Sequence, residues 1–455
     1  MHKKGRQGYA IPWRPSFLAT AIYPQENIIM EEKIRMQLRE LLNQEVVLAT
    51  GCTEPGAVAL CVTKACELLG REPERIELSL SKNVFKNAMG VGIPGTGMIG
   101  LPIAVAVAVV AGESRRQLEV LTVPAERVEE AKKWLANNAG CINIGVKENC
   151  DKLYIECTCT SGNDTATAII SRRHTNFTYL AHNGRVLHNN TITAPLESHV
   201  NPSAADGLNL TARLVYDYAT TAPIEELDFI RETVKYNDAA ATEGLKGYGL
   251  HTGKILMENA AGDIVHTVVA RTVAASDARM DGCTLPVYSN SGSGNQGIAC
   301  TLPVYNYGKA KGCDDESITR ALVLNHLMSI YIKRGIGRLS ALCGLVNASI
   351  GVTCGIVYLH GGSFDQMCFA IKNMINTIAG MVCDGAKPSC ALKMSTGLYS
   401  AFVSAELAYH DCVVDATDGL SESDVDCSIR KLGRLGCDGM DQVDDMVLDI
   451  MTHKQ

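Results

Sequence analysis

The sequence predicts an α+β protein in which a large, mostly helical domain carries a smaller inserted α/β domain with one sheet. From about residue 224 to the end, long stretches have apolar residues at helical spacing. Residues 117–195 instead show short alternating stretches separated by Gly and Asn, which is typical of strands and turns. The chain has 455 residues, 46% of them hydrophobic and 20% charged, which suits a globular protein of two or three domains.

Four segments are expected along the chain. Residues 1–29 are basic, contain only the short apolar run FLATAI and precede a helical pattern that opens at Met30, so we expect a disordered extension. Residues 30–115 are expected to form an N-terminal helical segment that packs with the C-terminal domain. Residues 116–200 would form the inserted α/β domain, and residues 201–455 the helical domain.

The helices and strands expected between residues 55 and 191 are predicted from helix start and stop signals and from the spacing of apolar residues. Residues 55–70 begin with Pro and end with Gly, as helices commonly do. Residues 75–85 alternate like a strand, whereas the apolar run 98–112 is too short to cross a membrane and predicts a buried helix. In the inserted domain, residues 117–123 and 142–148 are expected to be strands on either side of a helix at 124–138, and further strands should follow to residue 191.

Composition excludes several classes of partner. The net charge is −7 and aromatic residues make up only 5%, so neither a basic nucleic-acid surface nor a base-stacking platform is expected. The 18 cysteines do not indicate a secreted disulfide framework, because such frameworks belong to short chains and no signal peptide is recognisable. We expect a cytoplasmic protein with reduced thiols, no membrane contact and a small-molecule partner; a homodimer is a candidate assembly.

Two cysteines, Cys383 and Cys390, lie in a short segment broken by Gly385 and Pro388. Thiolates that converge on one point bind zinc or iron–sulfur clusters, and a loop of this kind can curl around a metal. Nearby lysines, Lys387 and Lys393, are expected to lower the thiol pKa values and so favour thiolates. The alternative is that both are buried free thiols.

A third cysteine, Cys52, precedes the helix predicted to begin near Pro55. The partial positive charge of a helix N-terminus stabilises a thiolate, so Cys52 is expected to be reactive or a ligand rather than a cysteine that merely occupies a turn. His360 follows an apolar helix and could transfer protons; the alternative is a histidine that caps the carbonyl groups of the helix end.

Two glycine-rich loops precede apolar segments, at residues 90–100 and 289–297. Backbone N–H groups in such loops bind carboxylates or phosphates, although plain tight turns would have the same composition. Neither loop fits a dinucleotide fingerprint or a P-loop. The candidate substrate-binding residues of the two loops are Gly95, Thr96, Gly97, Ser291, Ser293, Gly294 and Asn295.

Four motifs carry a resemblance to a known family: GCTEPGAVAL, KNAMGVGIPGTGMIGL, NSGSGNQG and GMVCDGAKPSCALK. In this order, and over Met30 to about residue 440, the sequence resembles the L-cysteine desulfidase family of the UPF0597 type. That family is related to the alpha chain of iron–sulfur L-serine dehydratases. The resemblance implies an oxygen-sensitive [4Fe-4S] cluster held by three cysteines, with one iron open.

The resemblance also assigns residues to the cluster. The family's ligand pattern, with separations of about 40 and 7 residues, falls on Cys343, Cys383 and Cys390. Cys52 occupies the position that the family associates with the open iron and with proton transfer. Two other cysteines, Cys354 and Cys368, do not fit the pattern and are expected to be core thiols.

The activity implied by the resemblance is β-elimination of L-cysteine to pyruvate, hydrogen sulfide and ammonia. In serine dehydratases the first cluster motif has the form GCxGE, whereas this sequence has ALCGLVNASIGV at that position. That departure favours cysteine over serine as the substrate. L-serine dehydration by the same cluster is the alternative. A third interpretation is a non-catalytic protein whose cysteines hold a structural metal or a redox-sensing cluster.

Overall fold

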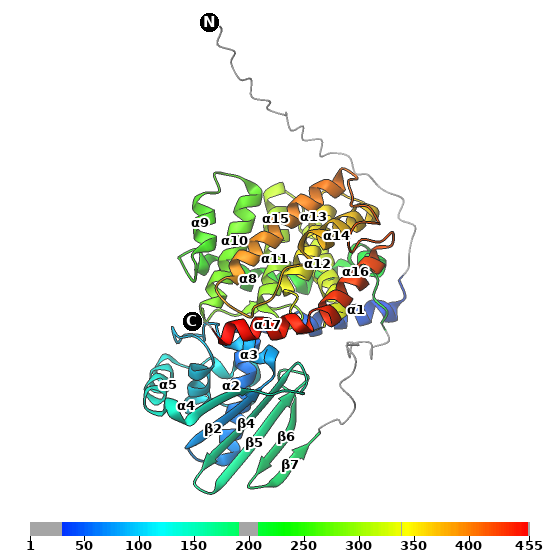
Figure 1. Cartoon of the computed structure of the whole chain (residues 1–455). Helices are drawn as coiled ribbons and strands as arrows, with labels where there is room; N and C mark the ends of the chain where they lie inside the picture. Colours follow the sequence, from blue (N-terminus) through cyan, green and yellow to red (C-terminus); the bar gives the residue numbers. More distant parts are fainter. Residues whose placement is uncertain (1–29, 191–207, 338, 454–455) are drawn as a thin grey trace.

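The computed structural model describes residues 30–190, 208–337 and 339–453, and it confirms the predicted α+β class. A large helical domain lies against a smaller domain built around one sheet (Figure 1). The segment 1–29, expected to be a disordered extension, lies outside the described residues.

The smaller domain contains one six-stranded sheet in the order β3-β2-β4-β5-β6-β7. Its strands are β2 (Arg75–Leu80), β3 (Ile142–Val146), β4 (Tyr154–Ser161), β5 (Asp164–Ser171), β6 (Phe177–His182) and β7 (Arg185–Asn189). Only the pair β2–β3 is parallel, and the others are antiparallel. A parallel pair needs a crossover connection, which the helices between β2 and β3 provide.

Helices cover one face of this sheet (Figure 1). They are α2 (Thr53–Leu69), α3 (Lys82–Ala88), α4 (Leu101–Ala111) and α5 (Ala125–Asn138), with the 3₁₀ turns η1 (Ser114–Leu121) and η2 (Ala139–Cys141). The sequence of α4 is apolar all round, and it is buried in the core as expected. On β4, Ile155, Cys157 and Cys159 point into the same core.

Two expectations for this half of the chain are wrong. Residues 30–115 do not pack with the C-terminal domain as a unit: α1 (Glu32–Glu45) does, but residues 53–111 share the core of the sheet domain. The reason is that β2 is an inner strand, whose apolar residues need the helices before and after it as cover. Residues 117–123, expected to be a strand, begin inside the 3₁₀ turn η1, with Gln117 at a φ of +53°.

The helical domain is built around α13 (Gly344–Leu359), which is buried on nearly all sides. It packs against α11 (Gly294–Lys311), α12 (Asp315–Ile336), α14 (Phe364–Ile378) and α15 (Cys390–Tyr409). The remaining helices are α6 (Ala212–Thr221), α7 (Ile224–Leu227), η4 (Asp228–Arg231), α8 (Glu232–Gly244), α9 (Thr252–Glu258), α10 (Ile264–Met280), α16 (Val425–Arg434), the π-helix η5 (Leu435–Gly439) and α17 (Asp441–Thr452). A two-stranded ladder of β1 (Leu48–Ala49) and β8 (Val287–Tyr288) ties the N-terminal segment to this domain.

The last helix, α17, lies along the boundary between the two domains (Figure 1). Its Asp444 forms a buried ion pair with Lys86 of α3 and accepts a hydrogen bond of 3.0 Å from Asn83. Exposed pairs Lys82–Asp445 and Lys152–Asp441, each at 2.8 Å, flank it. Charge complementarity therefore fixes α17 on the sheet domain.

Across the described residues, we find no helix whose length and apolar composition would let it cross a membrane.

Candidate active site

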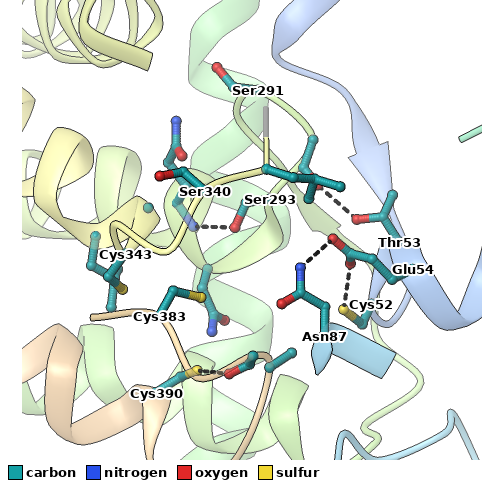
Figure 2. Close-up of a pocket in the computed structure, with 18 of the residues that line it drawn as sticks. Cys52, Thr53, Glu54, Asn87, Ser291, Ser293, Ser340, Cys343, Cys383 and Cys390 are labelled. Carbon is teal, nitrogen blue, oxygen red and sulfur yellow. Dashed lines mark hydrogen bonds between the residues drawn. The ribbon is translucent and has the colours of Figure 1, made fainter. Parts of the chain in front are cut away.

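A pocket lies where the two domains meet, and it brings together most of the residues selected from the sequence. From the side of the sheet domain it is lined by Cys52, Thr53, Glu54, Asn87 and His174. From the helical domain the lining includes Arg279, Ser291, Gly292, Ser293, Asn295, Gln296, Lys333, Ser340, Cys343, Cys383, Gly385 and Cys390. Figure 2 shows the three predicted ligand cysteines on one side and Cys52 with Glu54 on the other.

The three cysteines come from two neighbouring segments. Cys343 is the N-cap residue of α13, and Cys390 is the first residue of α15. The chain before α13 pairs with the loop before α15: the Cys343 amide donates to the carbonyl of Met381 (2.9 Å), and the Cys383 amide donates to that of Ala341 (2.6 Å). These bonds bring Cys343 and Cys383 to the same wall of the pocket.

The loop itself needs its glycine. Gly385 has a φ of +90°, and a Cβ at this position would lie 2.2 Å from the carbonyl oxygen of Lys86. The thiol of Cys390 donates to the Gly385 carbonyl across 3.6 Å. The loop thus turns tightly against α3, and both of its cysteines face the pocket.

We tested whether these thiols fit a metal group. No set of three or more His, Cys, Asp or Glu side chains within the described residues converges closely enough for a single metal ion. Zinc needs its ligands at about 2.3 Å from one centre, whereas an iron–sulfur cluster binds each cysteine at a different iron and so accepts a wider spacing. Three thiols line one pocket, two of them at helix N-termini that favour anionic sulfur, and thiolates are the donors that an iron–sulfur cluster takes.

Two of these thiols, Cys343 and Cys390, are not ionised by their protein surroundings alone. Burial, followed by repulsion from the other two thiols, raises the pKa of Cys343, and burial raises that of Cys390. The charge of Lys393 lowers both pKa values, as expected, but burial outweighs it. Lys393 is also paired with Asp384, and Lys387 donates to the backbone carbonyl of Asp384. A bound cation would reverse the balance, since coordinated thiols lose their protons.

Cys52 is at the N-cap of α2, as predicted, but its thiol is not an isolated anion. It is 7% exposed and donates a hydrogen bond of 3.1 Å to Oε2 of Glu54. Burial, and next the negative charge of Glu54, raise the pKa of Cys52. The expectation of a thiolate stabilised by the helix N-terminus is therefore wrong for this environment, and the carboxylate is the anionic member of the pair.

Glu54 is held by groups from three elements. Its Oε1 accepts from Nδ2 of Asn87 on α3 (3.1 Å) and lies 4.0 Å from Nε2 of His174, which is in the loop between β5 and β6. Burial opposes ionisation of Glu54, but His174 and the hydrogen bonds from Cys52 and Asn87 outweigh it and lower the pKa. This buried carboxylate next to a thiol is suited to accept and return a proton.

The loop that contains Ser291, Ser293 and Asn295 forms the third wall. Ser293 is the N-cap of α11, and its hydroxyl accepts from the amide of Gln296 at 3.3 Å. Thr53 donates to the carbonyl of Gly292 (2.7 Å), which joins this loop to the start of α2. Ser291 donates to Oδ1 of Asn290 (2.8 Å), and Asn295 accepts from Arg279 (3.2 Å). The loop thus presents several polar groups beside the cysteines.

Some predicted residues are not brought to the pocket. Gly95, Thr96 and Gly97 form a turn that bonds elsewhere: the Gly95 amide donates to Gly282 (3.1 Å), and the Thr96 hydroxyl donates to Ile93 (2.8 Å). This turn packs on the end of α10 instead of facing the pocket, so the substrate-binding role expected for it is not supported. Gly294 is also absent from the lining, but it lies against the Arg279 side chain.

His360 is also remote, which contradicts the catalytic role expected for it. It is the C-cap of α13, and the 16 residues of that helix separate it from Cys343 by about 24 Å. Its ring stacks on Tyr307, with a hydrogen bond of 2.6 Å between Nε2 and the phenol oxygen. His360 does lie at the helix end, but its backbone N–H, and not its ring, bonds to the helix carbonyls.

Sequence reasoning missed several polar residues of the pocket, among them Glu54, Asn87, His174 and Arg279. Glu54 lies inside the motif GCTEPGAVAL and Asn87 inside KNAMGVGIPGTGMIGL. These motifs could therefore have indicated both residues, whereas only a cysteine and glycine-rich turns were selected from them. His174 and Arg279 carry no local signal, because only the tertiary fold brings them to Glu54 and to Asn295.

Comparison with known proteins identifies the family. Residues 115–449 match the family described as serine dehydratase alpha chain. The chain belongs to this family. The match begins at the 3₁₀ turn before α5 and extends into α17, so it includes Cys343, Cys383 and Cys390 but not Cys52.

Relatives named UPF0597 proteins cover almost the whole chain. One from Phocaeicola vulgatus is 53% identical over 92% of this chain and 98% of its own length. Others from Porphyromonas gingivalis (46% identical, 94% and 100%) and Oleidesulfovibrio alaskensis (42% identical, 91% and 97%) are similar over comparable lengths. The match thus covers nearly the whole length of these UPF0597 relatives, and the family resemblance found in the motifs is confirmed.

Proposed function

We propose that the protein is a lyase that cleaves L-cysteine by β-elimination to pyruvate, hydrogen sulfide and ammonia, with a [4Fe-4S] cluster held by Cys343, Cys383 and Cys390. The observation that carries the proposal is the convergence of these thiols with the Cys52–Glu54 pair in one pocket between the domains. Membership of a family described as serine dehydratase alpha chains supports elimination from a β-substituted amino acid.

A cluster with an open iron would supply a Lewis acid that weakens the bond to the leaving group. The chain's own residues would do the rest. The Cys52–Glu54 pair would take the proton from Cα of the substrate, with Glu54 as the ionised member that receives it and the Cys52 thiol as its hydrogen-bond donor. Asn87 and His174 hold Glu54 in the orientation this needs.

Elimination breaks the Cα–H and Cβ–S bonds and forms the Cα–Cβ double bond. The sulfur departs with the bonding pair and leaves the pocket as sulfide. The enamine that remains tautomerises to an imine, and water hydrolyses the imine to pyruvate and ammonia. This last step needs no further residue, so the chemistry asked of the protein is proton transfer and orientation.

Cysteine is preferred to serine as the substrate because the residues around the first ligand, ALCGLVNASIGV, depart from the GCxGE form of serine dehydratases. A soft thiol also suits an iron–sulfur site better than a hydroxyl does. L-serine dehydration by the same residues is the second candidate, and the family description itself favours it. A non-catalytic metal or redox-sensing role remains as a third outcome of the tests.

The deciding experiment is anaerobic purification followed by parallel assays with L-cysteine and L-serine. We expect about four irons per chain, sulfide release from cysteine, and weaker pyruvate release from serine. Cys343→Ala, Cys383→Ala and Cys390→Ala should each lose iron, while the matched control Cys354→Ala, a buried thiol that bonds to Ile350 within α13, should keep it.

The outcomes separate the candidates. Faster turnover of serine than of cysteine would establish the dehydratase. Iron without turnover of either amino acid would favour the sensing role, and full activity in iron-free protein would refute the cluster.

A further inference from the structure

Arg279 is a buried cation in the pocket, and no acidic side chain of residues 30–190, 208–337 or 339–453 forms an ion pair with it. It lies in the last turn of α10, is 6% exposed and lines the pocket with Cys52 and Asn295. Within the described residues its guanidinium has no ion pair. Its two hydrogen bonds go to neutral oxygens: the Gly51 carbonyl (2.9 Å) and Oδ1 of Asn295 (3.2 Å). Burying a charge without a counter-ion is costly, so this arrangement needs an explanation.

The same helix shows how the protein pairs an arginine whose role is structural. Two turns earlier, Arg271 makes a two-pronged contact with Asp238, with Nε and Nη2 at 2.6 and 2.7 Å from the two carboxylate oxygens. Arg271 and its partner are also more exposed than Arg279. The more deeply buried arginine is thus the one that lacks a carboxylate.

The position of Arg279 is fixed by its neighbours. A Cβ on Gly294 would lie 2.2 Å from its Nε, so only glycine admits the side chain there. That Nε is buried and has no hydrogen-bond partner in the part of the chain that the structure describes. The hydrogen bonds to Gly51 and Asn295 use two of the five N–H donors of the guanidinium. The planar guanidinium of Arg279 is thus fixed in place with N–H donors to spare, which suits it to bind an anion with two oxygens, such as a carboxylate.

We propose that Arg279 binds the α-carboxylate of the substrate, and that the pocket therefore selects free α-amino acids over their amides and esters. The inference rests on the proposed function, since it assumes an amino-acid substrate. With its carboxylate at Arg279 and Asn295, such a substrate would occupy the space between Cys52 and the three ligand cysteines. Ser291 and Ser293, which were expected to bind the carboxylate, would then line the site beside Arg279.

The test compares ligands that differ only at the carboxylate. Anaerobically purified full-length protein is titrated with L-alanine and with L-alaninamide, neither of which has a leaving group, and binding is followed by calorimetry and by the shift in melting temperature. We expect wild-type protein to prefer L-alanine about tenfold or more, which is the scale of one charge-assisted hydrogen-bond pair. This arm requires no variant, so it stands even if substitutions impair folding.

Variants then assign the effect. Arg279→Lys should weaken L-alanine binding at least tenfold and raise KM for cysteine more than it lowers kcat, while Arg279→Gln should abolish the preference for the carboxylate. The matched control, Arg271→Gln on the same helix, should keep the preference and change only stability.

Two results would overturn the proposal: wild-type protein that binds the amide as tightly as the acid or binds neither, or an Arg279→Gln protein that keeps the preference. Failure of the proposed function is distinguishable, because carboxylate-dependent binding would then persist without turnover of cysteine or serine.

Discussion

At the scale of single residues, the sequence shows where a side chain lies relative to a helix, but its three-dimensional surroundings determine its protonation state. Cys52 is at a helix N-terminus, where a thiolate would be favoured, yet burial and Glu54 together keep the thiol protonated. The negative charge instead belongs to Glu54, which three neighbouring side chains hold. The reactive unit is therefore the pair and not the cysteine alone.

Replacement of Glu54 by glutamine tests this pair. Glu54→Gln keeps the shape of the side chain but removes the proton acceptor, so kcat for the elimination should fall by about 10²- to 10⁴-fold while iron content stays the same. Steady-state kinetics and iron analysis on anaerobic protein measure both. Glu67→Gln, at the solvent-facing end of the same helix, is the control and should be near wild type. Unchanged kcat in Glu54→Gln would rule out the proton-transfer role.

His326 gives the fold a pH dependence of known sign. Its ring is fully buried between Asn290 and Thr301, both uncharged, at 3.1 and 3.2 Å. Burial lowers its pKa from 6.5 to about 3. Below pH 6.5 the unfolded chain therefore binds a proton at His326, whereas the folded protein does not. The contribution of His326 to the free energy of unfolding is thus complete above pH 6.5 and is lost as the pH falls toward 3.

We expect His326→Gln to flatten this dependence. The variant loses stability at pH 7 because its hydrogen bonds change, but its melting temperature should fall less steeply than that of wild type between pH 6.5 and 4. The predicted slope difference corresponds to about 1 kcal/mol per pH unit. His410→Gln, an exposed site on the C-cap of α15, should leave the slope unchanged. Parallel curves for wild type and His326→Gln would contradict the assignment.

At the scale of elements, the site depends on α3, a helix of seven residues that is held from two sides. Its Lys86 and Asn83 bind Asp444 of α17, and its Asn87 binds Glu54 in the pocket. The backbone of Lys86 also lies against Gly385 of the cysteine loop. A short helix has little stability of its own, so its packing in the sheet domain and its bonds to α17 together determine where Asn87 lies.

Asp444→Asn should therefore be strongly destabilising, by about 3–5 kcal/mol, because it leaves the ammonium of Lys86 buried without a counter-ion. Urea unfolding followed by circular dichroism measures the change. The double variant Lys86→Met/Asp444→Leu should recover much of the loss, since it removes both charges. For the exposed pair Lys82–Asp445, Asp445→Asn should cost less than about 1 kcal/mol. Equal effects at Asp444 and Asp445 would refute the role of the buried pair.

At the scale of the whole molecule, the pocket exists only because two domains with separate cores meet. The proposed ligands lie before α13, in the loop and at the start of α15, so one cluster would add a link between parts of the helical domain that backbone hydrogen bonds and the packing of α13 on α15 already align. Binding to the folded state alone raises stability.

Removal of iron should therefore lower the melting temperature. Protein treated anaerobically with a chelator is expected to melt several degrees below the iron-loaded protein, because it loses the cross-link between these segments. Differential scanning calorimetry of both forms measures the change. In Cys383→Ser the two treatments should give the same melting temperature. A wild-type protein whose melting is insensitive to iron would count against a cluster at these cysteines.

The sequence by itself determined the helical and sheet character and most elements, because periodicity and start and stop signals are local properties. Its resemblance to a known family supplied the proposed set of ligand cysteines. It also identified Cys52 and the Ser291–Asn295 loop, since both lie next to helix starts that the pattern reveals.

Only the tertiary structure decided which of these residues meet. It placed α2 to α4 with the sheet, removed His360 and Gly95–Gly97 from the site, and brought in His174 and Arg279 from distant segments. It also determined which member of the Cys52–Glu54 pair carries the proton. Burial and neighbouring charges set that, and no local sequence pattern encodes them.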